Sequence, residues 1–192
     1  MPEIWFSLPM ILIYSALFGV TIKIADLLDE HGLKWFKGSA IIFGIIWGVF
    51  GSLLVVSDSL VANTILAMVV AFIFRMRIDY RNHAIATVMI ISTFLISSTF
   101  QLQTFFIFLG TFIAFGSIKD IFGGYYKNKS WINKLNETGW YVSIVPLVYS
   151  IITSNWIVFY ALGPIPIFYN IVKYIGWKYG FNGVKRIKKK SA

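Results

Sequence analysis

Residues 39–77 read SAIIFGIIWGVFGSLLVVSDSLVANTILAMVVAFIFRMR and contain two apolar stretches, 39–57 and 59–74, separated only by Asp58. Neither stretch contains a charged residue, and basic side chains return only with Arg75 and Arg77. A bilayer core of about 30 Å is crossed by roughly 20 apolar residues in helical form. The segment therefore predicts two membrane-spanning helices joined by a tight turn.

Five more apolar stretches surround this pair, and most of the seven hold about 16–19 residues. They cover 4–22, 84–100, 103–118, 139–153 and 166–182. The whole chain is 58% hydrophobic and 13% charged, whereas soluble proteins average about 25% charged residues. We expect an all-α, polytopic membrane bundle of about seven (six or seven) transmembrane helices. It forms a single domain over 1–182, followed by a basic tail over 183–192.

The 17 Lys and Arg residues fall only in alternate gaps between the stretches, or in and after the last one. Cytoplasmic loops of membrane proteins carry this excess of basic residues, and Trp residues gather at both membrane interfaces. Trp5 and Trp156 fall at one predicted interface, Trp35, Trp131, Trp140 and Trp177 fall at or beside the other, and Trp47 lies mid-span. Both signals predict a multi-pass protein of the cell membrane, with its N-terminus outside and its C-terminus in the cytoplasm.

The formal net charge is +9 and the chain has no cysteine. Because the positive charges are dispersed among loops, we interpret them as contacts with anionic lipid headgroups on the cytoplasmic side and not with nucleic acid. The absence of cysteine excludes disulfides, thiolate metal ligands and cysteine nucleophiles.

Small residues recur every four positions in 39–57, at Ala40, Gly44, Gly48 and Ser52. Such a stripe lets two membrane helices approach closely. The third and fifth stretches offer small residues that would fit against it, and a second copy of the chain is another candidate partner, which would make a homo-oligomer.

Further along, we expect an outer turn between Ser154 and Pro166, partly lying along the membrane interface, because Gly163-Pro164-Ile165-Pro166 disfavours a continuous helix.

Six of the eight acids lie on the predicted cytoplasmic side, as do both histidines. Carboxylates bind Mg²⁺ together with phosphate oxygens, so Mg²⁺ is the candidate cofactor. The candidate metal ligands are Asp26, Glu30 and Asp79, and the candidate catalytic residues are Asp79, His83 and Asp120. If 75–83 is helical, Arg75, Asp79 and His83 share one face.

Basic side chains beside these acids suit a phosphate group, because a guanidinium binds phosphate oxygens in bidentate fashion. The candidate substrate-binding residues are Arg75, Arg77, Arg81, Lys119 and Lys173. The resulting hypothesis is a protein that binds, or acts on, a lipid phosphate at the cytoplasmic interface; no motif decides whether it is an enzyme.

Two other classes stay open. A small transporter or channel would need polar groups through the bilayer, for which Asn63, Thr64, Ser97, Gln101, Asn170 and Lys173 are the candidates. A structural or assembly subunit would use the small-residue stripe as an interface. In either case the charged loop residues would only solvate helix ends or form salt bridges.

Overall fold

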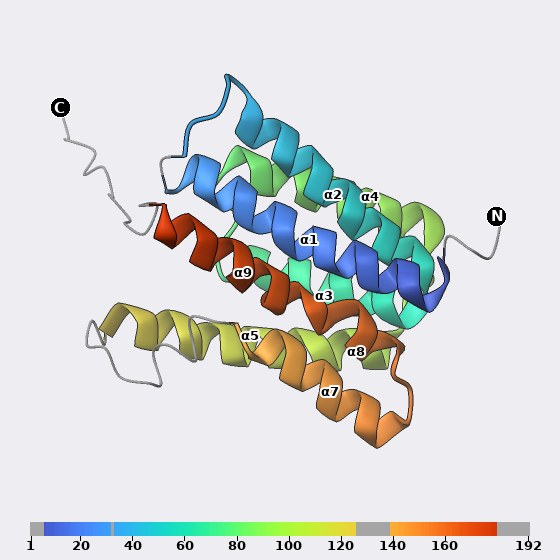
Figure 1. The fold of residues 1–192 in the computed structure, drawn as a ribbon. Coiled ribbons are helices and arrows are strands. Elements are labelled where there is room, and N and C mark those ends of the chain that lie inside the picture. The colour runs from blue at the N-terminus through green and yellow to red at the C-terminus, as the bar shows by residue number, and fades with distance from the viewer. Residues whose placement is uncertain (1–5, 32, 126–138, 180–192) are drawn as a thin grey trace.

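The computed structural model describes residues 6–31, 33–125 and 139–179, and every regular element within them is a helix (Figure 1). The helices are α1 (Leu8–Asp29), α2 (Ser39–Ser57), α3 (Ser59–Phe74), α4 (Arg81–Ser97), α5 (Leu102–Tyr125), α7 (Tyr141–Thr153), α8 (Ile157–Leu162) and α9 (Pro164–Lys178). Four segments are long and apolar enough to cross a membrane: α1, α2, residues 102–121 of α5, and α8 with α9. The expected all-helical architecture is confirmed, and it is consistent with a membrane bundle.

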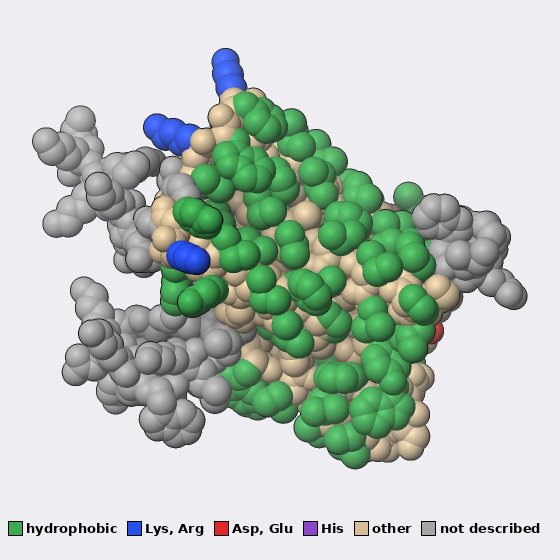
Figure 2. Space-filling model, viewed as in Figure 1, with side chains coloured by type: hydrophobic (Ala, Val, Ile, Leu, Met, Phe, Trp, Pro, Cys, Tyr) green, Lys and Arg blue, Asp and Glu red, His purple; other side chains and the backbone are tan. Residues whose placement is uncertain are grey.

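The helices run alternately between two ends of the bundle (Figure 1). We call one of them the basic end, where α1, α3, α5 and α9 finish and α2, α4 and α7 begin. The turns at the opposite end, at 58, 98–101 and 154–156, contain no Lys or Arg. On the face shown in Figure 2, Lys and Arg side chains lie only toward the basic end, and the helix surfaces between the two ends are apolar.

The turn between α2 and α3 is a single residue, Asp58. Its carboxylate accepts hydrogen bonds from the backbone N–H groups of Leu60 and Val61 at 2.7 and 3.2 Å. This N-cap supplies partners for two of the N–H groups that a helix start leaves free. The sequence prediction of a tight hairpin is confirmed here, with the helix boundaries expected.

The stripe on α2 packs against α4 of the same chain. A Cβ atom at Gly48 would lie 3.0 Å from Cα of Ala86 and 2.8 Å from Sδ of Met89. One turn further along, Thr93 on α4 donates a hydrogen bond to Ser52 at 2.9 Å. The close approach was thus predicted correctly, but the helix that makes it is α4 and not the third or fifth stretch.

Several helix boundaries differ from expectation: α4 covers Arg81–Ser97 instead of 84–100, and α5 continues to Tyr125 instead of ending near residue 118. Two further differences have identifiable reasons. α1 continues to Asp29 instead of ending near residue 22, because the charged side chains that follow residue 22 are buried and paired inside the bundle. The expected turn over 154–166 begins at Ser154 as predicted but is shorter: Ser154 has φ 57° and closes α7, and helix resumes at Ile157. Gly163 keeps helical dihedrals, and Pro164 lies in the first turn of α9, where its missing N–H is tolerated.

Candidate functional site

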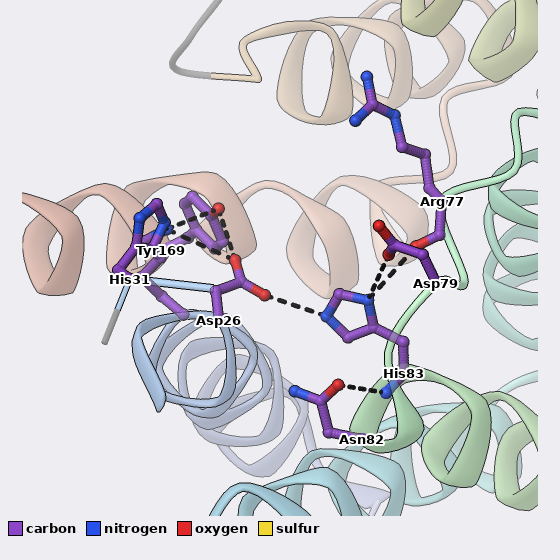
Figure 3. Close-up of polar contacts among 8 residues, drawn as sticks. Asp26, His31, Arg77, Asp79, Asn82, His83 and Tyr169 are labelled. Carbon is purple, nitrogen blue, oxygen red and sulfur yellow. Dashed lines mark hydrogen bonds and ion pairs between the residues drawn. The ribbon is translucent and has the colours of Figure 1, made fainter. Parts of the chain in front are cut away.

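Asp26 forms the centre of a buried polar network at the basic end. It lies in the last turns of α1 and is 6% exposed. Its carboxylate accepts a hydrogen bond from the Tyr169 hydroxyl of α9 at 2.8 Å and lies 3.1 Å from Nε2 of His83 on α4 (Figure 3). Lys23, one turn earlier on α1, places its ammonium 3.5 Å from the same carboxylate. Three helices therefore meet at one acid.

Lys23 is only 3% exposed, which is unusual for a lysine. Besides Asp26, its ammonium contacts the Tyr169 hydroxyl at 3.2 Å and Nε2 of His31 at 3.1 Å. Burial and the nearby Lys23 charge lower the pKa of His31, so a neutral ring accepts this hydrogen bond. A buried ammonium is tolerated only when it is paired in this way. The network therefore ties α1 to α9 and to the segment after α1.

Asp26, Glu30 and His83 form a smaller set that we call the acid–histidine cluster. Each residue offers one ligand atom, a carboxylate oxygen from each acid and an imidazole nitrogen from the histidine. These three atoms lie within 4.8 Å of one another. Glu30 follows Asp26 by one helical turn and caps the end of α1, whereas His83 lies in the first turn of α4. Carboxylate oxygens with one imidazole nitrogen are ligands that divalent cations accept.

Glu30 has an altered acidity. Its burial, and then the negative charge of Asp26, raise the pKa of Glu30 from 4.5 to about 7. Its carboxyl is therefore divided between protonated and ionised forms near neutral pH. A positive charge delivered between Glu30 and Asp26 would favour the ionised form.

The ring of His83 is held from its other side. Nδ1 lies 3.3 Å from the backbone carbonyl oxygen of Arg77 and 3.9 Å from the Asp79 carboxylate (Figure 3). A partner of this kind on one ring nitrogen orients the other nitrogen toward a metal in many sites. Here the nitrogen so oriented is Nε2, which faces Asp26.

A second charged set, the arginine–aspartate group, lies at the same end. Arg75, which caps α3, donates from Nε and Nη2 to one Asp120 oxygen at 3.1 and 2.7 Å, and Arg77 pairs with the other oxygen. The Arg75 guanidinium crosses α5 at Gly116, where a Cβ atom would overlap it. Two arginines share one carboxylate, so this group carries a net positive charge.

The expected alignment of Arg75, Asp79 and His83 on one helical face is wrong. α3 ends in a turn in which Met76 has φ 52° and the Arg77 N–H bonds to the Phe72 carbonyl oxygen at 2.9 Å. This is the hydrogen-bond pattern of a Schellman motif, which normally places Gly at the position of Met76. The chain then runs without helix to Arg81, so Arg75 pairs with Asp120 and not with Asp79.

The structure thus divides the predicted site residues into sets. Asp26, Glu30 and His83 come together, with Asp79 at the edge and 61% exposed. Asp120 joins Arg75 and Arg77 instead, and the backbone of Arg77 links the two sets. Arg81 is an exposed residue in the first turn of α4, Lys119 is half-buried on α5, and Lys173 lies over the Trp177 ring at 4.7 Å.

Sequence reasoning missed Lys23, His31 and Tyr169 as site residues. Lys23 and Asp26 did carry a signal, since opposite charges three residues apart share a helix face inside an apolar run. Tyr169 carried none, because it is 143 residues from Asp26 in the chain.

No protein-family model matches the chain, and comparisons with curated proteins and with solved structures give no match either. The contacts describe a largely buried set of two carboxylates and one imidazole, which are ligands that a divalent cation accepts. The arginine–aspartate group is a separate charged set at the same end of the bundle.

Proposed function

We propose that the chain is an integral protein of the cell membrane that crosses the bilayer seven times. In this proposal the N-terminus is outside and the basic end faces the cytoplasm. The alternating course of the helices and the position of the Lys and Arg residues support it. α3, α4 and α7 are shorter than the roughly 20 residues of an average span. A short span is accommodated by local thinning of the bilayer.

Labelling of single cysteines tests this topology, because the chain has no cysteine of its own. We expect Lys37→Cys, in the exposed turn before α2, to react with a membrane-impermeant maleimide only after the cells are opened. Ser154→Cys, in the exposed turn at the opposite end, should react in intact cells. Reaction of both residues from the same side would contradict the seven-crossing topology.

For the function, we infer that the acid–histidine cluster binds a divalent cation that carries the phosphate of a membrane lipid. The observation that carries this inference is the approach of three ligand atoms, from Asp26, Glu30 and His83, within 4.8 Å in a largely buried place. Mg²⁺ is commonly held by one or two carboxylates plus substrate phosphates, and this cluster offers two carboxylates.

The charges around the cluster favour a cation and a phosphate together over a bare cation. Lys23 already neutralises part of the negative charge of Asp26, so a divalent cation alone would leave excess positive charge. A phosphate supplies the missing negative charge. The arginine–aspartate group adds a net positive charge at the same end of the bundle.

An apolar pocket at the same end supports a lipid as the source of that phosphate. It has a volume of about 260 Å³ and lies between the last turns of α1 and α9. Its walls include Leu27, the neighbour of Asp26, together with Ile24, Val172 and Ile175. Hydrocarbon chains fit such walls, whereas a free phosphate gains nothing from them.

Thermal stability in detergent tests the function. We expect the Tm of the wild-type protein at pH 8 to rise when Mg²⁺ and a short-chain phosphatidic acid are added together. A ligand at 100 times its Kd stabilises by about 2.7 kcal/mol. Glu30→Gln should show little of this rise, because an amide is a weak ligand for Mg²⁺. An equal rise in both proteins would contradict the assignment of Glu30.

The pH dependence of the same two proteins without cation is the control. Because the folded-state pKa of Glu30 is raised to about 7, wild type loses stability as the pH rises from about 4.5 to 7. Glu30→Gln is neutral at every pH and should not share this loss. We therefore expect the variant to be the more stable protein at pH 8, with no such advantage at pH 4.

Two of the polar residues considered for transport, Asn63 and Gln101, contact each other at one end of the bundle. Asn63 donates hydrogen bonds to the carbonyl oxygens of Ser59 and Thr99, both at 2.8 Å, and accepts one from the Gln101 N–H. These contacts join the α2–α3 and α4–α5 turns at the end opposite the acid–histidine cluster. They serve packing of that end.

A further inference from the structure

Two buried N–H donors close to His83, Nδ2 of Asn82 and Nε1 of Trp47, have no hydrogen-bond partner within the described part of the chain. Nδ1 of His31 and Nη1 of Arg75, at this end of the bundle, are also buried without a partner among the described residues. Asn82 is 0% exposed and Trp47 is 5% exposed. Neither residue was among the site residues expected from the sequence.

The orientation of the Asn82 amide follows from its own contact. Its Oδ1 accepts a hydrogen bond from the backbone N–H of His83 at 2.8 Å, so the other end of the amide is the NH₂ group. Figure 3 shows this nitrogen pointing toward α1, on the side of His83 that faces Asp26. The free donor is thus directed into the region of the cluster.

Trp47 lies on α2 directly beside the same histidine. Its ring centroid is 6.0 Å from that of His83, edge to face, and 5.6 Å from that of Phe18. Asn82 packs against the same helix at Gly44, where a Cβ atom would lie 2.8 Å from Cα of Asn82. Both donors therefore occur where α2, α4 and α1 meet, next to the cluster.

Buried donors without a partner are rare because each carries the full cost of its lost hydration. Phe at position 47 would keep most of the apolar packing without that cost. Two such donors next to three candidate metal ligands therefore indicate an oxygen acceptor that belongs to a ligand.

We propose that Asn82 and Trp47 are ligand-binding residues that donate hydrogen bonds to an oxygen of the phosphate bound at the acid–histidine cluster. The proposal rests on the proposed function and specifies its ligand. The cation takes one terminal oxygen of the phosphate, and the two buried donors take a second. Phosphomonoesters and phosphodiesters of membrane lipids both offer at least two terminal oxygens, so the ligand class is a lipid phosphate with at least two free oxygens.

Two variants test this role by measuring Mg²⁺ and phosphate responses separately. Trp47→Phe removes one N–H, and we expect roughly tenfold weaker binding of short-chain phosphatidic acid, since hydrogen bonds to charged oxygens are the strong ones. Its response to Mg²⁺ alone should stay. Asn82→Asp keeps the acceptor for the His83 N–H but replaces the NH₂ donor by an anionic oxygen. It should bind Mg²⁺ at least as well as wild type while losing the phosphatidic acid response, whereas a purely structural role would weaken both responses together.

Tyr14→Phe is the matched control. The Tyr14 hydroxyl is also buried without a partner within the described residues, but it lies 12 positions before Asp26 on α1, about 18 Å away along the helix. We expect this variant to respond to Mg²⁺ and to phosphatidic acid as wild type does. A loss of response equal to that of Trp47→Phe would overturn the proposal.

Comparing the affinities of different ligands distinguishes the remaining outcomes. Phosphatidic acid should bind better than inorganic phosphate, which lacks the chains. Wild-type affinity for phosphatidic acid in both Trp47→Phe and Asn82→Asp would overturn the role of the donors. If inorganic phosphate binds as tightly as phosphatidic acid, the role of the two donors stands but the lipid assignment is wrong. If the wild-type protein shows no response to Mg²⁺, alone or with any phosphate, the proposed function itself is wrong.

Discussion

Replacing Asp26 with alanine should lower the free energy of unfolding by about 3–5 kcal/mol, the cost of removing one partner from a buried ion pair. The side chain of Lys23 is only 4% exposed and would keep its charge without the carboxylate that balances it. Tyr169 and His83 would lose their acceptor at the same time. Reversible unfolding in mixed detergent micelles, followed by circular dichroism, measures the change.

Asp79→Ala is the matched control for Asp26→Ala. Asp79 is 61% exposed and lies 3.9 Å from the His83 ring, so its removal should cost less than about 1 kcal/mol. Adding Lys23→Met to Asp26→Ala should recover part of the lost stability, because the uncompensated charge is removed as well. Equal losses for the two aspartates, or no recovery in the double variant, would contradict a buried network centred on Asp26.

Gly48→Leu should also destabilise the bundle, by about 1–3 kcal/mol or more, because overpacking forces neighbouring groups apart. Even a single Cβ atom at this position would lie 3.0 Å from the Ala86 backbone of α4, and that backbone has no rotamer to change. The same unfolding measurement gives the size of the loss.

The neighbouring residue provides the comparison for Gly48→Leu. Val49 is 41% exposed on the same helix, so Val49→Leu should leave stability within about 0.5 kcal/mol of wild type. If both leucines are tolerated equally, the stripe does not contact α4 but faces lipid or a second chain.

Much of the fold could be predicted because apolar length is a strong signal. The ranges 39–57 and 59–74 coincide with α2 and α3, since Gly38, Asp58 and Arg75 bound the apolar runs on each side. The end of α1 could not be placed the same way. Lys23 and Asp26 look like the start of a loop in sequence, and only their tertiary partners make them compatible with a buried helix.

The sequence predicted which residues belong to the candidate site better than it predicted which of them contact one another. Asp26, Glu30 and His83 were all expected, but Asp26 and His83 are 57 residues apart, so their contact depends on how α1 and α4 pack. The partner of Arg75 was missed because Met76 ends α3 in a turn that usually needs Gly. Asp120 then becomes its acceptor from 45 residues away.

Binding of Mn²⁺ in place of Mg²⁺ tests the central claim most directly, because its electron spin reports the ligand atoms. We predict one saturable Mn²⁺ per chain in the presence of phosphatidic acid, with a nitrogen coupling from an imidazole. The chain has two histidines, and the coupling should disappear in His83→Gln but persist in His31→Gln. The absence of saturable Mn²⁺ binding, or a nitrogen coupling that survives His83→Gln, would contradict a cation site formed by Asp26, Glu30 and His83.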